Sequence, residues 1–552
     1  MAHTSEQHEL TVARAVVVAT MVATLTFAKQ IAFLLVEDNR YFFLWRFTDS
    51  LGVILDLVIL ISIVVALTLA SRRWPLIERI WNRVLVLAFT SGLLTLLPTW
   101  LLPPMSLNAY RLWIVAIIVT AVSFVWRRLP VVPFVAGVSM ILSPLIPILL
   151  FQLVTASTWS TSAESAGASP RPQFASSQAG ERAVPIFLFV FDEWSVKRTT
   201  ANGEFLPEYP NSRALAAQSL TFSEAWSYST RSYHSLPALL FQNDQRIQIG
   251  PGMTFWEDKG QNVPTSSLPS LLGRARQAGY HTALQGFYLP YKRILGEQVE
   301  YERSRPVFPR GYSLSESMKL SAVRNLQWIV EPFAKDTRRR YEAGIQSRWW
   351  YEINQTTLDE SLQLIDAAPR NIMAFFHWPL PHGPFVINAD GTYNEQYPLG
   401  GILDGLHGPH AQLEDYQRHL KYHDTVLGKI VEELKRSGKF DDALIIMTAD
   451  HSWRPDPMEK EPNWVIDPSR RRVPLVIKLP HQQSGRLLSK TVYNNLSLEP
   501  IVEAAINGAP LTESDVVALI DRMPDLPTPT GKNSTRPTTP PAGAGDGPTR
   551  QP

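Results

Sequence analysis

Residues 443–453 read ALIIMTADHSW, and they predict a buried strand that ends in a chemically useful pair. The apolar run from Ala443 to Met447 is typical of a central strand in a parallel sheet. Asp450 and His451 follow that run at the carboxyl end of the strand, where open α/β sheets bind their ligands. A carboxylate and an imidazole at such a position can hold a divalent metal, although an Asp that only caps the next turn would have the same local sequence.

A second strand of the same kind lies far upstream. Residues 184–195 read VPIFLFVFDEWS, an apolar run that leads to Asp192 and Glu193. Because parallel strands present their carboxyl ends at one edge of a sheet, we expect both strand ends to form one composite metal site, in which either Asp192 or Glu193 is the ligand. Mixed carboxylate and imidazole ligands suit Zn²⁺ or Mn²⁺ better than Ca²⁺, which prefers oxygen ligands throughout.

Composition limits the class of protein. The chain has 552 residues, enough for two or more structural units, and its formal net charge of +2 favours no nucleic-acid partner. It has no cysteine, which excludes a disulfide framework and thiolate metal ligands. The first 155 residues are very apolar and the rest are ordinary, so we expect a membrane region followed by an α/β domain.

Five apolar segments have the length of a membrane span, at roughly 13–36, 51–71, 84–102, 110–126 and 131–154. Arginines occupy the second loop (Arg72, Arg73, Arg79 and Arg83) and the fourth loop (Arg127 and Arg128). The positive-inside rule places both loops and the N-terminus in the cytoplasm, and everything after residue 155 outside. We therefore expect an integral membrane protein with about five helical spans, the first of which is an anchor and not a removable signal.

Two ionisable residues, Lys29 and Asp56, lie within the apolar segments. Their depths match on antiparallel neighbouring spans, and a charge in lipid is costly without a partner, so we expect them to pair. The pair would be a structural ion pair or would line a polar entry for a lipid headgroup.

The sequence divides into four parts. Residues 1–155 form the expected transmembrane helical region, and 156–183, rich in Ser, Ala, Gln and Pro, form a flexible linker. The catalytic domain is expected at 184–523. The Pro-, Thr- and Gly-rich residues 524–552 cannot build a core and are expected to be disordered.

The hydroxyl-rich residues 221–241 read TFSEAWSYSTRSYHSLPALLF. Pro237 precedes an apolar run and predicts the start of a helix there. A hydroxyl just before that start would lie near amides that attract an anionic ester, although an ordinary capped loop has the same composition.

The remaining segments alternate between helix and strand. We expect a helix followed by a strand in 267–288, and a strand from Ile372 to Phe376. The latter strand runs into a Pro-rich turn that holds His377 and His382. Further along the chain we expect an amphipathic helix in 415–440 and a strand in 471–480. This alternation predicts an α/β domain with a mainly parallel sheet.

In their order, these pieces resemble the alkaline phosphatase superfamily, specifically its sulfatase-like branch. The matching motifs are FVFDE, SYHSLPALL, FHWPLPHGPF, YHDTVLGKIVEELKRSGKFDDALIIMTADHS and RRVPLVI, which together cover roughly residues 184–480. Five spans followed by an external domain resemble the lipid A phosphoethanolamine transferases and the lipoteichoic acid synthases.

The resemblance implies roles for particular residues. Asp192 and Glu193 match the first metal-ligand position of the family, and Asp450 with His451 match the second. Ser232 matches the nucleophile, with Thr230 as the alternative. His382 matches a substrate-binding histidine. SYHSL lacks the Pro and Arg of the C/S-x-P-S-R motif that directs formylglycine maturation, and the disulfides of the transferases are absent.

We therefore expect a membrane enzyme that uses a divalent metal to move a phospho-substituent to or from a lipid or glycan of the cell envelope, through a phosphoserine intermediate on Ser232. Two alternatives remain open. One is a membrane-tethered hydrolase, either a sulfatase or a phosphodiesterase, and the other is a catalytically silent binder of anionic glycans.

Overall fold

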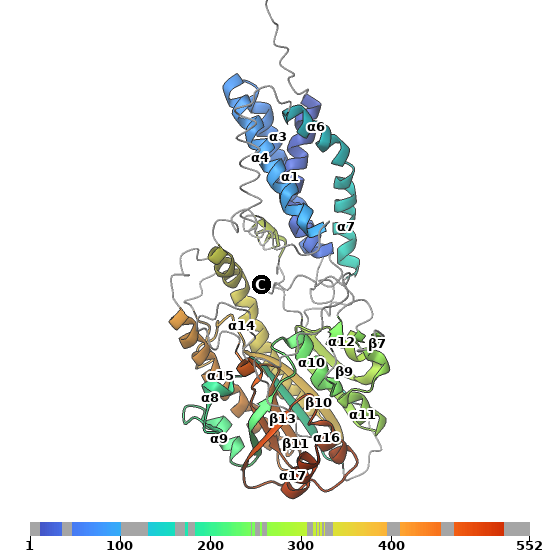
Figure 1. The fold of residues 1–552 in the computed structure, drawn as a ribbon, viewed down its shortest axis with the longest axis vertical. Coiled ribbons are helices and arrows are strands. Elements are labelled where there is room, and N and C mark those ends of the chain that lie inside the picture. The colour runs from blue at the N-terminus through green and yellow to red at the C-terminus, as the bar shows by residue number, and fades with distance from the viewer. Residues whose placement is uncertain are drawn as a thin grey trace, which may run out of the picture.

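The computed structural model describes residues 12–35, 47–100, 131–159, 172–174, 183–243, 246–248, 254–256, 262–305, 335–394, 409–453 and 468–523, and part of 313–325. The apolar helices of the N-terminal region stand together at one end of the molecule, and an α/β domain forms the other end (Figure 1).

The N-terminal helices are α1 (Val12–Leu35), α3 (Phe47–Ser71), α4 (Pro75–Trp100), α6 (Val131–Leu142) and α7 (Leu145–Trp159). Among the described helices, α3 alone is long and apolar enough to cross a membrane by itself. The bent pair Pro133–Leu142 and Ile146–Thr155 passes the same criteria when it is counted as one span. The expected span at 110–126 lies outside the described residues, so the count of five spans stays a prediction.

The α/β domain is built on an eight-stranded sheet in the order β13-β4-β12-β11-β1-β10-β8-β9. Its strands are β1 (Ile186–Asp192), β4 (Leu220–Trp226), β8 (His281–Phe287), β9 (Tyr301–Arg305), β10 (Ile372–Pro381), β11 (Leu444–Ala449), β12 (Leu475–Lys478) and β13 (Arg486–Tyr493). Within this sheet only β12 runs opposite to its neighbours. The predicted α/β class with a mainly parallel sheet is confirmed.

Strand β1 is central, and all seven of its residues are buried. Its side chains alternate between two cores: Ile186, Leu188 and Val190 face one, and Phe187, Phe189 and Phe191 face the other. A strand covered on both faces explains why the sequence shows a continuous apolar run and no apolar–polar alternation.

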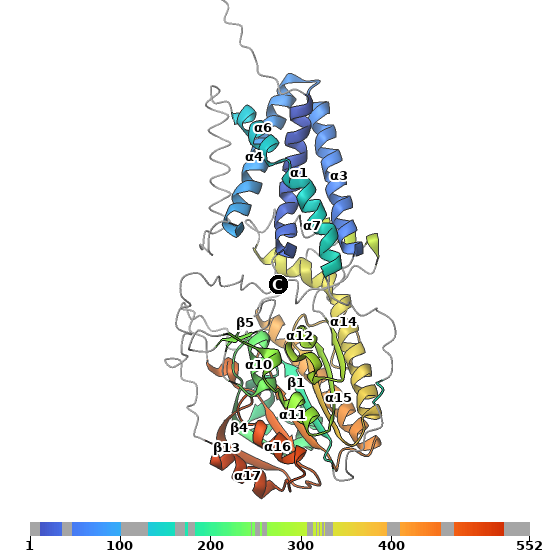
Figure 2. The same cartoon turned by 90° about the vertical axis from the view of Figure 1, so that its right-hand side faces the viewer.

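Helices cover both faces of the sheet (Figure 2). The first core includes residues of α10 (Ser232–Phe241), α11 (Leu271–Gln277), α12 (Tyr291–Leu295), α16 (Glu499–Ile506) and α17 (Glu513–Arg522); the second includes residues of α9 (Pro210–Ala216), α14 (Lys335–Ala367) and α15 (Pro409–Arg436). Shorter elements are α8 (Val196–Thr199), β2 (Thr200–Ala201), β3 (Glu204–Phe205), β5 (Arg246–Gln248), β6 (Thr254–Trp256), β7 (Asn262–Pro264), η1 (Thr265–Ser267), η2 (Gly296–Gln298) and η4 (Pro468–Arg471).

The predicted helix start at Pro237 is wrong. Helix α10 begins at Ser232, and Pro237 lies inside it. The carbonyl of Arg231 accepts hydrogen bonds from the amides of His234 and Ser235, so the first turn is closed before the proline is reached. The ring of Pro237 then removes one helical hydrogen bond without ending the helix.

Little of the expected linker and nothing of the expected tail is described. In the linker only residues 172–174 are described, and the ring of Phe174 packs against His281 and Tyr301 with centroid distances of 5.6 Å and 6.3 Å. Part of the segment predicted as a tether is therefore held against the α/β domain. Residues 524–552 lie outside the described residues, so the disordered tail stays a prediction.

Burial of histidine in the second core makes the fold sensitive to acid. His423 is 1 % exposed, its ring contacts Phe191 and Trp194, and burial lowers its pKa to about 3. The native state therefore keeps His423 neutral while the unfolded chain takes up a proton below about pH 6.5. Stability present above that pH is lost as the pH falls, by about 2 kcal/mol at pH 5 for this residue.

We expect His423→Phe to lose less stability than the wild type between pH 7 and pH 5, because it removes one proton-linked cost. Melting temperatures of the full chain in detergent at both pH values measure the difference. His481→Gln is the control, since His481 is exposed. An equal loss in wild type and His423→Phe would contradict the prediction.

Candidate active site

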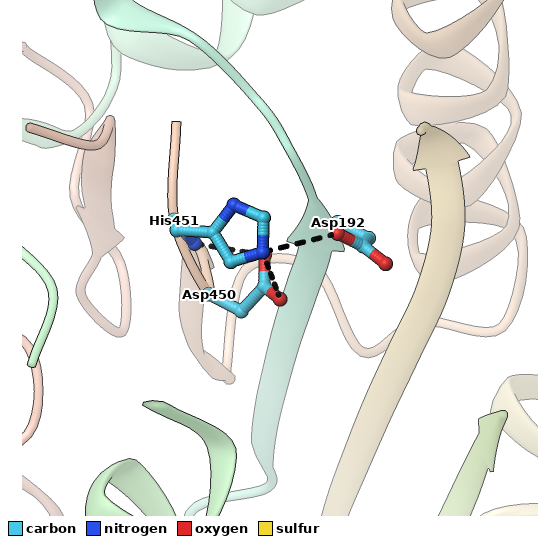
Figure 3. Close-up of side chains that lie close together, drawn as sticks. All are labelled: Asp192, Asp450 and His451. Carbon is cyan, nitrogen blue, oxygen red and sulfur yellow. Dashed lines mark hydrogen bonds and ion pairs between the residues drawn. The ribbon is translucent and has the colours of Figure 1, made fainter. Parts of the chain in front are cut away.

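The register between two neighbouring strands builds the centre of the site. Phe191 of β1 pairs with Ala449 of β11, so the next residues, Asp192 and Asp450, leave the sheet side by side. Nε2 of His451 lies 3.7 Å from Oδ1 of Asp192 and 3.4 Å from Oδ2 of Asp450 (Figure 3). One ligand atom from each of the three buried residues lies within 4.8 Å of the others.

The chemistry of these three side chains fits a cation. Nδ1 of His451 lies 3.0 Å from the carbonyl oxygen of Ser452. Since a carbonyl only accepts hydrogen bonds, Nδ1 carries the proton and the lone pair of Nε2 faces the two carboxylates. Oδ2 of Asp450 is buried and accepts no hydrogen bond within the part of the chain that the structure describes. A bound metal ion would satisfy all three facing acceptors at once.

The backbone fixes the carboxylate of Asp450. Its Oδ1 accepts hydrogen bonds from the amides of Glu193 at 3.2 Å and His451 at 2.8 Å. These donors hold Oδ1 in place, and Oδ2 is directed at the imidazole.

Ser232 lies next to this group. It is the first residue of α10, its side chain is buried, and its Oγ lies 3.4 Å from Nε2 of His451. Thr230, the other expected nucleophile, is half-buried in the loop before the helix, and its hydroxyl makes no hydrogen bond to any described residue. The structure thus places the hydroxyl of Ser232 beside the imidazole of His451.

The structure separates the two acidic residues at the end of β1. Glu193 is not a member of the three-residue group; its Oε1 lies 4.0 Å from Nε2 of His382. Glu193 has a φ of 66°, an uncommon value for a residue with a side chain. The hydroxyl of Tyr416 holds this turn, because it donates to the carbonyl of Glu193 at 2.6 Å and accepts from the amide of Ser195 at 3.2 Å.

His382 lies beside Glu193 and is partly exposed. Its side chain is 23 % exposed and its ring stacks on Trp350 of α14, with 5.9 Å between centroids. His377, five residues earlier in β10, is fully buried. Its Nδ1 lies 2.9 Å from the hydroxyl of Tyr291, and burial lowers its pKa to about 4, so it is neutral at physiological pH.

The sequence interpretation missed the arginines before β12. The carbonyl of Arg471 accepts the amide of Ser227 at 2.7 Å, and the carbonyl of Arg470 accepts the amide of Ser452 at 2.8 Å. This short segment therefore joins the hydroxyl-rich loop to the end of β11. Three consecutive arginines before an apolar strand were the available signal.

Arg471 is a cation that lacks a carboxylate partner among the described residues. Its Nε donates to the carbonyl of Ser227 at 2.9 Å, and its guanidinium lies over the ring of Tyr493 at 5.6 Å. Burial lowers the pKa of Arg471 from its ordinary value. The remaining N–H groups of this guanidinium are suited to an anion.

We expect Asp450→Asn to weaken metal binding by at least about 100-fold, because the amide keeps the shape of the side chain and loses the anionic ligand. Metal content of the purified full chain after dialysis, measured by mass spectrometry, tests this. Asp442→Asn is the control, since Asp442 pairs with Arg370 at the surface. Full metal content in Asp450→Asn would show that Asp450 is not a metal ligand.

Comparison with known proteins identifies the family of the α/β domain. A family model described as Sulfatase matches residues 185–502. No curated protein matches the chain significantly. The solved structure of Ps i-CgsB in complex with k-i-k-neocarrahexaose is 18% identical, with a TM-score of 0.37, and the match covers 60% of this chain and 73% of that one.

Two further solved structures are similar at the same level. Phosphonate monoester hydrolase of Agrobacterium radiobacter is 16% identical, with a TM-score of 0.35 and coverage of 60% of this chain and 78% of that one. The lipoteichoic acid synthase LtaP from Listeria monocytogenes is 15% identical, with a TM-score of 0.35 and coverage of 60% and 74%. At these values none of the three indicates a substrate. The family model spans more than half of the chain, and the chain belongs to the sulfatase family.

Proposed function

We propose that this protein is a membrane-anchored, metal-dependent enzyme that transfers a phospho-substituent, of the phosphoethanolamine or phosphoglycerol type, to or from a lipid or glycan of the cell envelope. The observation that carries the proposal is the position of Ser232, whose Oγ lies 3.4 Å from Nε2 of His451 in the group formed with Asp192 and Asp450. A hydroxyl beside a metal site is the arrangement that nucleophilic transfer requires.

Asp192, Asp450 and His451 would hold the cation, with Zn²⁺ or Mn²⁺ favoured by the mixed ligands. When bound, a divalent cation lowers the pKa of a neighbouring hydroxyl and neutralises charge on ester oxygens. Ser232 is oriented for attack by its place at the start of α10, and its Oγ forms the new bond to phosphorus as the bond to the leaving oxygen breaks. The serine proton is released and the leaving oxygen takes up a proton, which leaves a phosphoserine.

His382 supplies a proton donor on the exposed side, where its Nε2 lies 4.0 Å from Oε1 of Glu193. In the second half of the cycle an acceptor hydroxyl, or water, attacks phosphorus. The bond to Oγ of Ser232 then breaks, Oγ regains a proton, and the attacking hydroxyl loses one. The amides at the start of α10 and the guanidinium of Arg471 favour the anionic ester throughout.

A phospho-substituent is favoured over a sulfate ester by the sequence around the nucleophile. SYHSL, residues 232–236, has His at the position of the motif proline and Leu at the position of the motif arginine. An unmodified serine is suited to a phosphoserine intermediate, and formylglycine is the group that the motif provides to sulfatases.

The arrangement of the helices supports a catalytic domain outside the cell. Ser50 near the start of α3 donates to the carbonyl of Leu153 in α7 at 2.6 Å, so both helix ends lie at the end of the bundle that faces the α/β domain (Figure 2). Arg72 and Arg73 lie in the turn between α3 and α4, at the opposite end. By the positive-inside rule that opposite end is cytoplasmic.

We expect Ser232→Ala to lower turnover by about 10³-fold or more while the metal content stays unchanged, because the covalent step is lost and the ligands are kept. Thr230→Ala is the matched control and should retain activity. Turnover of a phosphodiester and intact-protein mass after substrate incubation are the measurements, with the adduct expected on Ser232.

Each other outcome changes the assignment. Full turnover in Ser232→Ala would end the covalent scheme or transfer the role to Thr230. Formylglycine at residue 232 would support a sulfatase, and a chain with neither metal nor adduct would be a silent binder. Mass spectrometry of lipids from cells with and without the protein identifies the transferred group.

Arg471→Met should raise KM for an anionic ester about tenfold, because one charge-assisted contact to the substrate is lost. Arg486→Met is the control, since Arg486 is exposed and pairs with Glu513. Initial rates over a range of substrate concentrations measure the effect. An unchanged KM in Arg471→Met would remove this residue from substrate binding.

A further inference from the structure

Helix α3 carries two carboxylates in a mainly apolar sequence. Asp49, Gly52 and Asp56 are three and four residues apart, which places them on one side of the helix. Carboxylates in a span are costly without partners, so this face requires a polar neighbour.

A segment from the α/β part of the chain supplies that neighbour. The described residues of 314–325 are helical, and Ser317, Ser321 and Asn325 repeat at intervals of four. All three are buried, with exposures of 3 %, 2 % and 6 %. A polar stripe that is buried in this way must face another part of the molecule.

Two close contacts join this stripe to α3. Oγ of Ser317 donates to Oδ1 of Asp49 at 2.8 Å, between residues 268 positions apart. Gly52 allows the two backbones to approach, because a Cβ at this position would lie 3.0 Å from the Cβ of Ser317 and from the amide nitrogen of Met318. Any larger residue at position 52 would push the two segments apart.

A third contact lies deeper along α3. The carboxylate of Asp56 faces the side chain of Ser321 and the backbone of Ala322. Oδ2 of Asp56, Oγ of Ser321 and the side-chain amide of Asn325 are buried without a hydrogen bond of good geometry to any described residue. Separation of the two helices would leave the two α3 carboxylates facing lipid, and this cost favours the docked arrangement.

We propose that the described helical residues within 314–325, among them Ser317, Ser321 and Asn325, belong to a docking helix that seats the α/β domain on the Asp49–Gly52–Asp56 face of α3. We further propose that this seat holds the active site at a fixed distance from the membrane for a lipid-borne substrate. The second half of this inference rests on the proposed function. A domain held only by a flexible linker would sample many distances, and docking raises the effective concentration of the active site at the lipid surface.

The contact between the docking helix and α3 can be tested by disulfide cross-linking, without a measurement of activity. The chain contains no cysteine, so only the introduced cysteines can form the disulfide. In the double variant Gly52→Cys and Ser317→Cys the two Cβ atoms lie close enough for a disulfide after a small adjustment. Oxidation of the full chain in membranes should cross-link this pair, as read from gel mobility after proteolysis between the two positions. The control pair is Gly137→Cys with Ser317→Cys, since a Cβ at Gly137 meets nothing within 4 Å.

The role of the seat is tested with two substrates. Gly52→Leu should lower the transfer rate from vesicles of phosphatidylethanolamine and phosphatidylglycerol about tenfold or more, because the active site is no longer held at the surface. Its rate on the water-soluble bis(p-nitrophenyl) phosphate should stay close to that of the wild type. Gly137→Leu, the matched glycine variant, should leave both rates unchanged.

The outcomes separate the two proposals. If the cysteine pair at 52 and 317 does not cross-link, the docking helix is overturned, whatever the substrate is. If the pair cross-links and Gly52→Leu changes the rates on both substrates by the same factor, the seat is structural and does not position the active site. If the wild type acts on neither substrate, the proposed function fails while the cross-link still decides the docking.

Discussion

The parallel pairing of β1 with β11 is the constraint on which the rest of the site depends. Its register brings Asp192 and Asp450 side by side in a buried environment, where two carboxylates repel each other unless donors or a cation compensate them. The amides of Glu193 and His451 supply part of that compensation. The apolar body of the sheet, covered on both faces, stabilises the arrangement well enough to keep these groups in place.

The features that follow from local sequence were predictable. Buried central strands have continuous apolar runs, and both acidic strand ends were therefore identified from residues 184–195 and 443–453. The choice between Asp192 and Glu193 was not predictable, because it depends on the backbone at Glu193. That turn is held by Tyr416 of α15, a residue 223 positions away along the chain, so local sequence could not reveal the contact.

The contacts of α3 were likewise predictable only in part. The length of its apolar segment identified α3 as a membrane span. The carboxylate of Asp56 within that segment was recognised as a charge that needs a polar partner. The predicted partner, Lys29, has a side chain outside the described residues, and Asp56 faces Ser321 and Ala322. Residues 300–345 are charged and have no clear period, so their sequence gave no sign that three polar side chains at intervals of four meet a membrane helix.

The reversed direction of β12 determines which residues lie near the group formed by Asp192, Asp450 and His451. Every other strand of this sheet runs toward the edge at which Asp192 and Asp450 lie, whereas β12 begins there, so the residues just before β12 lie beside Ser227 and Ser452. Arg470 and Arg471 are among those residues. Substitutions immediately upstream of β12 therefore change the charge beside Ser227 and Ser452, whereas substitutions immediately downstream of β12 fall at the opposite edge of the sheet.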